Sequence, residues 1–315
     1  MENLKLALIG CGSRGRGHLS VTREFEDVDF VAVCDPVEEV CRKTAEEFGI
    51  GRRYSSVEEL LDREELDAVV VATPAHLNAG TALPCLEQGI HTILEKPPGL
   101  NVEETEELRQ AAASSGAKCM VGWNRRFNPY IVEARRLIEE RGPVTQIVGE
   151  FHKSMRLMVA SGQFPPKMLD SLLLETPIHS IDIVRAIAAS EVAEVHSFAR
   201  RSCSEYRDVH SALILFENGC VANLISNYTT DHRLERYEIH GRLISAYLEG
   251  VNKGTMVYDG SHHELEYEIN DTRAQNRFFL DCVKENCPVT LPAANLDEAI
   301  KTMRVAQAIL DSVVD

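Results

Sequence analysis

Apolar and polar residues follow two different rhythms along this chain, and the change comes at about residue 123. Before that point, short apolar runs of strand character alternate with amphipathic stretches of helical spacing. The runs cover residues 6–9, 30–34, 68–72, 91–94 and 118–122. Strands that are apolar on both faces and alternate with helices predict a doubly wound parallel sheet. We therefore expect an α/β domain over residues 1–123.

Several helices between these runs carry start signals. Ser56 with Glu59, and Asn101 with Glu104, have the spacing of capping boxes. Pro36 suits the first turn of another helix. Helices are expected at about 15–25, 78–88 and 101–114, with further helices beginning after Pro36 and at Ser56.

The second half of the chain has the alternation of half-buried strands. After a helix at 129–140, strands are expected at 144–154, 193–201, 210–217, 220–228, 236–241, 244–249, 255–258 and 264–269. The pairs Asn218-Gly219 and Asp259-Gly260 are hairpin signals. Residues 168–189, 273–285 and 295–313 are predicted to be helical. This pattern predicts a second α+β domain over 124–315, with a large, mostly antiparallel open-faced sheet and last helices that return near the first domain. A cleft is expected between the two domains.

The composition argues against several classes of protein. The 315 residues carry a formal net charge of −16, which disfavours nucleic acid or an anionic membrane as the main partner. Nine cysteines are scattered without a CxxC pair, as in buried thiols of a reducing cytosol. No apolar run is long enough for a membrane span, and the N-terminus lacks the pattern of a signal peptide. A soluble, cytoplasmic protein is expected.

The first apolar run leads directly into Gly10-x-Gly12-x-x-Gly15. In a dinucleotide-binding turn the first glycine permits the tight turn, the second lets backbone N–H groups approach a pyrophosphate, and the third lets the next helix pack closely. The second run ends in Asp35, where an acid is expected to bind the ribose hydroxyls of the cofactor. The alternative is a glycine-rich turn in an ordinary βαβ unit. The order of strand, loop, helix, strand and acid favours a nicotinamide cofactor.

Two further apolar runs end in polar residues that suit a ligand site. Thr73-Pro74 follows the third run, and Glu95-Lys96-Pro97 follows the fourth. Because ligands bind outside the carboxyl ends of the strands in such sheets, these side chains are expected beside the glycine loop. A lysine on its own would be typical of a solvated strand end, but one between Glu and Pro at this edge favours a functional role.

A set of motifs that extends over most of the chain resembles one known family. The motifs are Gly10-x-Gly12-x-x-Gly15, Asp35-Pro36, Ala72-Thr73-Pro74, Glu95-Lys96-Pro97, Gly122-Trp123-Asn124-Arg125-Arg126-Phe127 and Ile178-His179-Ser180-Ile181-Asp182. Together they resemble the glucose–fructose oxidoreductase / inositol dehydrogenase / rhizopine-catabolism (Gfo/Idh/MocA) family of NAD(P)-dependent sugar and polyol oxidoreductases. The Glu-Lys-Pro motif is the most specific of them.

The resemblance implies roles for individual residues. Lys96 matches the catalytic lysine of the family and His179 its acid–base histidine, and Glu175 is the third catalytic candidate. The implied cofactor-binding residues are Gly10, Gly12, Ser13, Arg14, Gly15, Asp35, Thr73, Pro74, His76, Glu95, Lys96 and Asn124. The implied substrate-binding residues are Lys96, Arg126, Glu175, His179 and Asp182.

Three positions depart from the family pattern. Glu175 replaces an aspartate found in many members, and its longer side chain moves the carboxylate. Pro177 disfavours helical geometry at Thr176, so the helix is expected to start or kink there. Asn78 stands where the family often has histidine.

These residue types suit the oxidation of a secondary alcohol. His179 is the natural base for the hydroxyl proton because its ordinary pKa is close to working pH. Lys96 would stabilise the negative charge that develops on oxygen. On a continuous helix, Glu175 and Asp182 would share one face with His179. A histidine in an amphipathic helix is by itself more often structural, and only the other motifs favour a catalytic role.

The leading expectation is an NAD-dependent dehydrogenase acting on a sugar, a sugar derivative or a cyclitol. Asp35 would repel the 2′-phosphate of NADP, although Arg14 and Arg16 would offset that repulsion. Two alternatives stay open. One is an NAD-dependent glycosidase that works by transient oxidation and elimination, and the other is a non-catalytic cofactor-binding regulator.

Two expectations concern metals and partners. His262-His263 resembles a metal pair but lacks a nearby third ligand in the sequence, so we expect an exposed loop and no metal site. The predicted second sheet has more apolar surface than its helices would cover, which predicts a homodimer or homotetramer.

Overall fold

The computed structural model describes residues 3–314, and the chain divides into two units. Unit 1 comprises the chain up to Asn124 together with Thr272–Ile300, and unit 2 comprises Arg125–Asp271 together with the segment from Lys301 onward. The segment 272–300 groups with unit 1. Amphipathic spacing shows that a helix buries one face but does not show what covers that face, so the sequence alone does not assign this segment.

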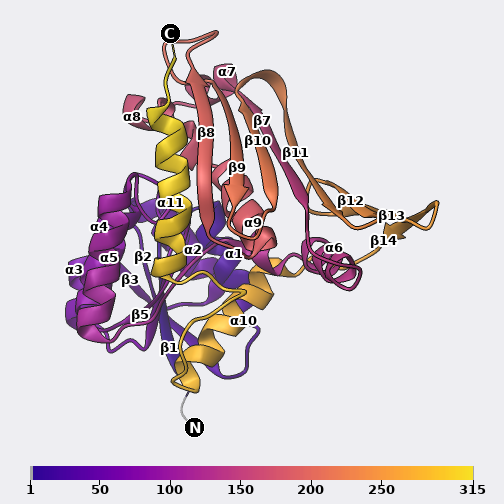
Figure 1. Ribbon diagram of the computed structural model, residues 1–315. Helices are drawn as coiled ribbons and strands as arrows, with labels where there is room; N and C mark the ends of the chain where they lie inside the picture. The colour runs from indigo at the N-terminus through magenta and orange to yellow at the C-terminus, as the bar shows by residue number, and fades with distance from the viewer. Residues whose placement is uncertain (1–2, 315) are drawn as a thin grey trace. The chain divides into compact units, whose positions relative to one another are not determined.

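Unit 1 contains the predicted parallel sheet, in the strand order β3-β2-β1-β4-β5-β6. Its strands are β1 (Leu4–Ile9), β2 (Val28–Cys34), β3 (Arg52–Tyr54), β4 (Ala68–Val71), β5 (His91–Leu94) and β6 (Cys119–Val121). Its helices are α1 (Ser13–Thr22), α2 (Glu38–Phe48), α3 (Val57–Arg63), α4 (Asn78–Glu87) and α5 (Val102–Ser115), and most of α10 (Asp271–Lys284) belongs to it. The strand order reverses between β1 and β4, which is where such sheets bind ligands. In Figure 1, β1, β2, β3 and β5 are labelled, and α3, α4 and α5 lie to their left.

The two capping signals in unit 1 were accurate, whereas Pro36 lies before the N-cap Val37 of α2 and not in its first turn. The Ser56 hydroxyl accepts a hydrogen bond from the Glu59 amide at 3.2 Å, and the Asn101 side chain accepts one from the Glu104 amide at 2.7 Å. Both capping predictions are therefore confirmed. The short strand β3 was not predicted, because it has no apolar run and two of its three residues are exposed.

Unit 2 contains an eight-stranded sheet in the order β14-β13-β12-β11-β7-β10-β9-β8. Strands β7 and β10 are parallel, and the other neighbours are antiparallel. The strands are β7 (Gln146–Ser154), β8 (Val192–Arg200), β9 (Val209–Phe216), β10 (Val221–Asn227), β11 (Thr229–Gly241), β12 (Ile244–Glu249), β13 (Lys253–Tyr258) and β14 (Ser261–Leu265). The α/β class and the open, mostly antiparallel second sheet are confirmed.

Helices in unit 2 differ from the prediction at α7 (Met155–Ala160), which was not expected, and over residues 168–189. The stretch expected to be helical over 168–189 is broken into α8 (Pro166–Leu169), a 3-10 turn η2 (Leu172–Leu174) and α9 (Ile178–Ala188). Pro177 stands at the N-cap of α9, so the prediction that the helix starts there is confirmed. The other unit 2 elements are η1 (Asn124–Phe127, whose first residue is in unit 1), α6 (Pro129–Glu139), α7 (Met155–Ala160) and most of α11 (Leu296–Asp311).

The predicted loop at His262-His263 was wrong. Both residues lie in the edge strand β14, where His263 stacks on Tyr258 with ring centroids 4.1 Å apart. An edge strand with exposed side chains lacks the apolar alternation that would have identified it.

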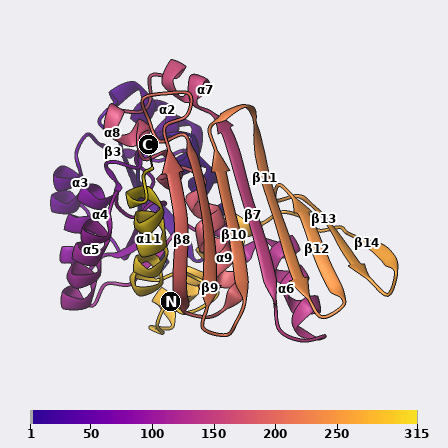
Figure 2. The same cartoon turned by 45° about the horizontal axis from the view of Figure 1, so that its top comes forward.

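The two faces of the eight-stranded sheet are covered differently. Helix α9 packs against β7 and β10, and α6 packs against β11, β12 and β13; both helices lie behind the sheet in Figure 2. The other face carries exposed apolar side chains, among them Phe198, Leu213, Leu215 and Ile225. Among residues 3–314, no helix combines the length and apolar character that crossing a membrane requires.

Candidate functional site

The glycine loop after β1 has the conformation that its three glycines predict. Gly10 has φ +95°, and a Cβ atom there would lie 2.5 Å from the carbonyl oxygen of Ala72 on the neighbouring strand end. A Cβ at Gly15 would overlap the carbonyl oxygen of Gly10. Side chains at these two positions are therefore excluded by backbone atoms, and α1 packs directly on the loop.

Gly12 is different, because nothing lies within 4 Å of the place where its Cβ would be. It is the N-cap of α1, and Ser13 is the first helical residue. Amide groups at a helix start have no partners within the helix and favour an anion. The open space at Gly12 and the start of α1 fit the pyrophosphate of a dinucleotide.

Asp35 follows β2 and holds the glycine loop. Its carboxylate accepts hydrogen bonds from the Cys11 amide at 2.8 Å and from the Val37 amide at 2.9 Å. Each carboxylate oxygen can accept more than one hydrogen bond, so these contacts leave capacity for ribose hydroxyls.

Glu95 links the Glu-Lys-Pro motif to the helix of the glycine loop. Its buried carboxylate accepts a hydrogen bond from Arg14 Nε at 2.6 Å and lies 2.7 Å from His18 Nε2, and the His18 ring also contacts Asn276 of α10. Burial opposes the ionisation of Glu95, but the charge of Arg14, the hydrogen bond of His18 and the charge of Lys96 hold its pKa well below the usual range. Glu95 is thus an ionised anchor inside unit 1.

Lys96 directly follows this anchor, at the carboxyl end of β5. The side-chain amide of the fully buried Asn78 donates hydrogen bonds of 2.9 Å to the backbone carbonyls of Glu95 and Pro97. The Thr73 hydroxyl donates to Asn78 Oδ1 at 2.8 Å. Asn78 therefore fixes the backbone on both sides of Lys96, which the sequence did not reveal.

The other predicted cofactor residues lie in two places in unit 1. Pro74 and His76 are exposed in the turn between β4 and α4. Asn124 is buried at the start of η1, after β6. All three follow carboxyl ends of parallel strands, as expected.

In unit 2, His179 lies in the first turn of α9 and is 5% exposed. Glu175 lies before the helix, and its carboxylate accepts a hydrogen bond from Lys153 Nζ at 2.8 Å. The prediction that Glu175, His179 and Asp182 share one face of a continuous helix was wrong, because the chain becomes helical only after Pro177. Lys153, at the end of β7, was missed as a member of this site.

Arg126 and Asp182 form a buried ion pair in which each side chain is 1% exposed. Two hydrogen bonds of 2.8 and 2.7 Å join them, and Asp182 also accepts one from Thr302 at 3.0 Å. The sequence placed both residues against the substrate. In the structure they satisfy each other, and this geometry is typical of a structural pair.

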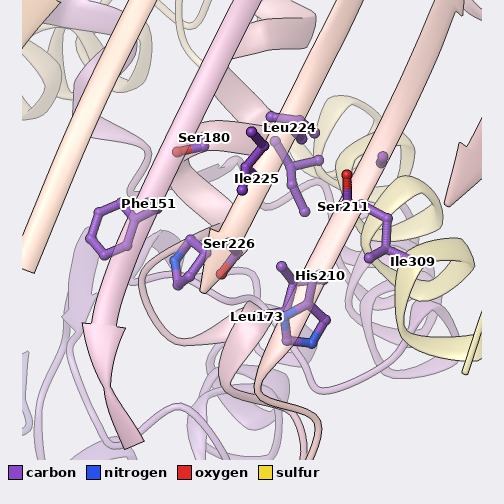
Figure 3. Close-up of a pocket in the computed structure, with 12 residues that line it drawn as sticks. Phe151, Leu173, Ser180, His210, Ser211, Leu224, Ile225, Ser226 and Ile309 are labelled. Atoms are coloured by element: carbon purple, nitrogen blue, oxygen red, sulfur yellow. The ribbon is translucent and has the colours of Figure 1, made fainter. Parts of the chain in front are cut away.

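A narrow cavity lies behind the first turn of α9. Figure 3 shows its lining from three strands, with Phe151 on β7, His210 on β9 and Ser226 on β10. His210 is 1% exposed. Burial, together with the nearby charge of Arg207, lowers the pKa of His210 to about 4, and the charges of Asp208 and Asp170 oppose this only in part.

The low pKa of His210 predicts acid lability. The unfolded chain takes up a proton at His210 near pH 6.5, whereas the folded chain resists it down to about pH 4. The free energy of unfolding should therefore decrease by about 3 kcal/mol as the pH falls from about 6.5 to about 4. Above pH 6.5 this histidine should cause no change. Denaturant titrations of wild type and His210→Gln at pH 7 and pH 4.5 measure this. The difference in the free energy of unfolding between the two proteins should change from pH 7 to pH 4.5. The same difference at both pH values would contradict the prediction.

The comparisons with known proteins agree with this geometry. The family described as "Oxidoreductase family, NAD-binding Rossmann fold" matches residues 4–123, and the "GFO/IDH/MocA C-terminal domain" matches residues 131–246. The chain belongs to the Gfo/Idh/MocA family. The resemblance drawn from its motifs is confirmed, and unit 1 contains an NAD(P)-binding Rossmann domain.

Two relatives in sequence and one solved structure illustrate the range of proteins that are similar to this chain. It is 23% identical to a myo-inositol 2-dehydrogenase of Thermotoga maritima over 81% of its length and 78% of the relative's. It is 25% identical to a UDP-N-acetylglucosamine 3-dehydrogenase of Acidithiobacillus ferrooxidans, with coverage of 82% and 78%. An oxidoreductase of Agrobacterium radiobacter, solved with NAD+, L-tartaric acid and magnesium, superposes with a TM-score of 0.84 at 18% identity, covering 98% of this chain and 96% of that one.

Proposed function

We propose that this protein is an NAD-dependent dehydrogenase acting on a secondary alcohol of a sugar, a sugar derivative or a cyclitol. The observation that carries the proposal is the clamp around Lys96. Glu95 ties the motif to the helix of the glycine loop, and Asn78 holds the backbone on both sides of the lysine. Such fixation is typical of a catalytic group and not of a solvated surface lysine.

The proposed mechanism divides the chemistry between residues of this chain. The nicotinamide supplies the hydride acceptor. His179 removes the hydroxyl proton, and Lys96 places its positive charge on the oxygen that becomes negative. Glu175, held by Lys153, binds a neighbouring hydroxyl group of the substrate.

The test is a panel of cyclitols, aldoses and nucleotide sugars incubated with NAD+ or NADP+, with absorbance of the reduced nicotinamide as the readout. Net formation of NADH with a free sugar or cyclitol supports the proposal. Cleavage of a glycoside without net redox change would instead identify an NAD-dependent glycosidase. Cofactor binding with no turnover of any compound would favour a regulator.

NAD is expected to bind more tightly than NADP. Asp35 is fixed by two backbone amides, so its charge cannot easily move away from a 2′-phosphate. Arg14 is engaged by Glu95 and Arg16 by Glu47, which reduces their ability to offset the repulsion. Titrations of the free enzyme should give at least a tenfold preference for NAD, equivalent to about 1.4 kcal/mol. Tighter binding of NADP would contradict this.

The open face of the eight-stranded sheet is expected to form a homodimer or homotetramer. Phe198 is 61% exposed, and Leu213 is 45% exposed on the adjacent strand. A contiguous apolar surface of this kind commonly marks an interface. Light scattering at micromolar concentration should give a dimer or larger assembly, and Leu213→Glu should lower the mass. Wild-type protein that is monomeric would refute the prediction.

A further inference from the structure

A polar cluster in unit 2 lies beside the residues proposed to bind the substrate. Its core is Lys153, whose ammonium lies 2.8 Å from Glu175 Oε2 and 2.9 Å from the Thr176 hydroxyl. Thr176 and Glu175 immediately precede the helix that carries His179. Lys153 and Glu175 are 18% and 20% exposed, so both retain surface that a ligand can reach.

Arg233 adds a second cation to this cluster. Its guanidinium lies over the ring of Phe151 at 5.3 Å from the centroid, and Phe151 lies two residues before Lys153 on the same face of β7. The buried Tyr228 lies near enough to both Glu175 and Arg233 for their charges to affect its pKa. Burial raises its pKa, Glu175 raises it further, and Arg233 acts in the opposite direction.

The hydrogen bonds of Arg233 leave part of its guanidinium available. Nη2 donates to Glu235 at 2.8 Å, and within residues 3–314 Nε and Nη1 have no hydrogen-bond partner. The side chain of Arg233 is 54% exposed, whereas Glu235 is 3% exposed and is also bonded to Arg125, which is 13% exposed. Stacking on Phe151 and the ion pair with Glu235 therefore orient the guanidinium of Arg233, whose remaining N–H donors a ligand can reach.

The charged side chains around Arg233 differ in exposure. Glu235 and Asp271 are buried and lie near Arg125, whose side chain is 13% exposed. Lys153, Glu175 and Arg233 keep more exposed surface, and they are two cations and one carboxylate. A ligand that reaches this surface meets more charged donors than acceptors, in a protein whose net charge is −16.

We propose that Arg233 and Lys153 form a subsite for an anionic group, a carboxylate or a phosphate, on the sugar or polyol substrate. The guanidinium edge suits two oxygens of one anion, and the ammonium adds a point charge. Glu175 then accepts a hydroxyl of the same substrate. This inference rests on the proposed function, because it concerns the substrate of the same site.

The test is a binding measurement with defined probes. Calorimetry on the NADH complex compares D-glucose with D-glucuronate and D-glucose 6-phosphate, so that the two probes distinguish carboxylate from phosphate. At least one anionic sugar is expected to bind about tenfold or more tightly than glucose, and added salt should reduce the difference. Equal affinities, or no binding of either anion up to about 10 mM, would overturn the inference.

Variants assign the effect to the two cations. Arg233→Gln and Lys153→Gln should each reduce the ratio of anionic to neutral affinity about tenfold. Arg236→Gln is the matched control, because Arg236 lies on the same strand but points to the other face, where it pairs with Glu150 at 2.6 Å. An unchanged ratio in both cluster variants would overturn the subsite.

The oxidation assay separates this inference from the proposed function. If none of the sugars or cyclitols reduces NAD+ but the anionic preference is measured, the dehydrogenase proposal fails and the subsite stands. If neutral and anionic sugars are oxidised with equal kcat/KM, the subsite fails and the dehydrogenase proposal stands.

Discussion

Replacing Lys96 with methionine, or His179 with alanine, is expected to lower turnover by about a hundredfold or more in each case. Lys96 loses the charge that stabilises the developing alkoxide, and His179 loses the base that removes its proton. Because both would act on one hydroxyl group, the double variant should lose less than the product of the two single effects. Steady-state kinetics on an established substrate measure all three.

Two further readouts identify the chemical roles. Cofactor affinity should change far less in His179→Ala, because this residue belongs to unit 2, whereas Lys96→Met is expected to weaken NAD binding somewhat. The rate should rise with pH through the ionisation of the histidine, and this limb should shift or disappear in His179→Ala.

Matched controls keep the result specific. Lys118→Met removes a lysine that bonds to Asn286, and His196→Ala removes a histidine with a 70% exposed side chain. Both controls should retain turnover. Near-normal turnover in His179→Ala would show that His179 is structural, and Glu175 would then be the first candidate for the base.

Gly15→Ala is expected to affect the stability of the fold, whereas Gly12→Ala is expected to affect NAD binding. The new Cβ at Gly15 overlaps a backbone oxygen of Gly10, which cannot move without displacing the loop from β4. Gly15→Ala should therefore destabilise the fold by several kcal/mol, on the order of 3 or more. Gly12 has φ −68° and an open Cβ position, so Gly12→Ala should fold normally and bind NAD at least tenfold more weakly.

Gly17 supplies the control for both glycine variants. It lies within α1 and has nothing within 4 Å of its Cβ position, so Gly17→Ala should stabilise the fold by about 0.5–1 kcal/mol. Thermal unfolding and NAD titration measure the three variants together. Unchanged NAD affinity in Gly12→Ala would contradict the cofactor cradle, and unchanged stability in Gly15→Ala would contradict the close packing of α1.

The sequence alone determined those features of this protein that depend on neighbours along the chain. The glycine spacing specified a turn in which backbone sterics permit only glycine at Gly10 and Gly15. Ser56 and Asn101 specified helix starts through bonds to amides three residues away. Apolar periodicity specified both sheets, because strands bury alternate or all side chains whatever their partners. Pro177 specified the start of α9 through the geometry of its own ring.

Only the tertiary structure decided which charged side chains meet. Glu95 contacts Arg14 and His18, which are far from it in the sequence. Glu175, which precedes α9, pairs with Lys153 of β7. Arg126 and Asp182, two residues expected to bind the substrate, likewise form a buried ion pair although they lie far apart in the sequence. A charged residue has many equivalent partners along a sequence, and the choice follows from the desolvation and distance that the packed elements impose.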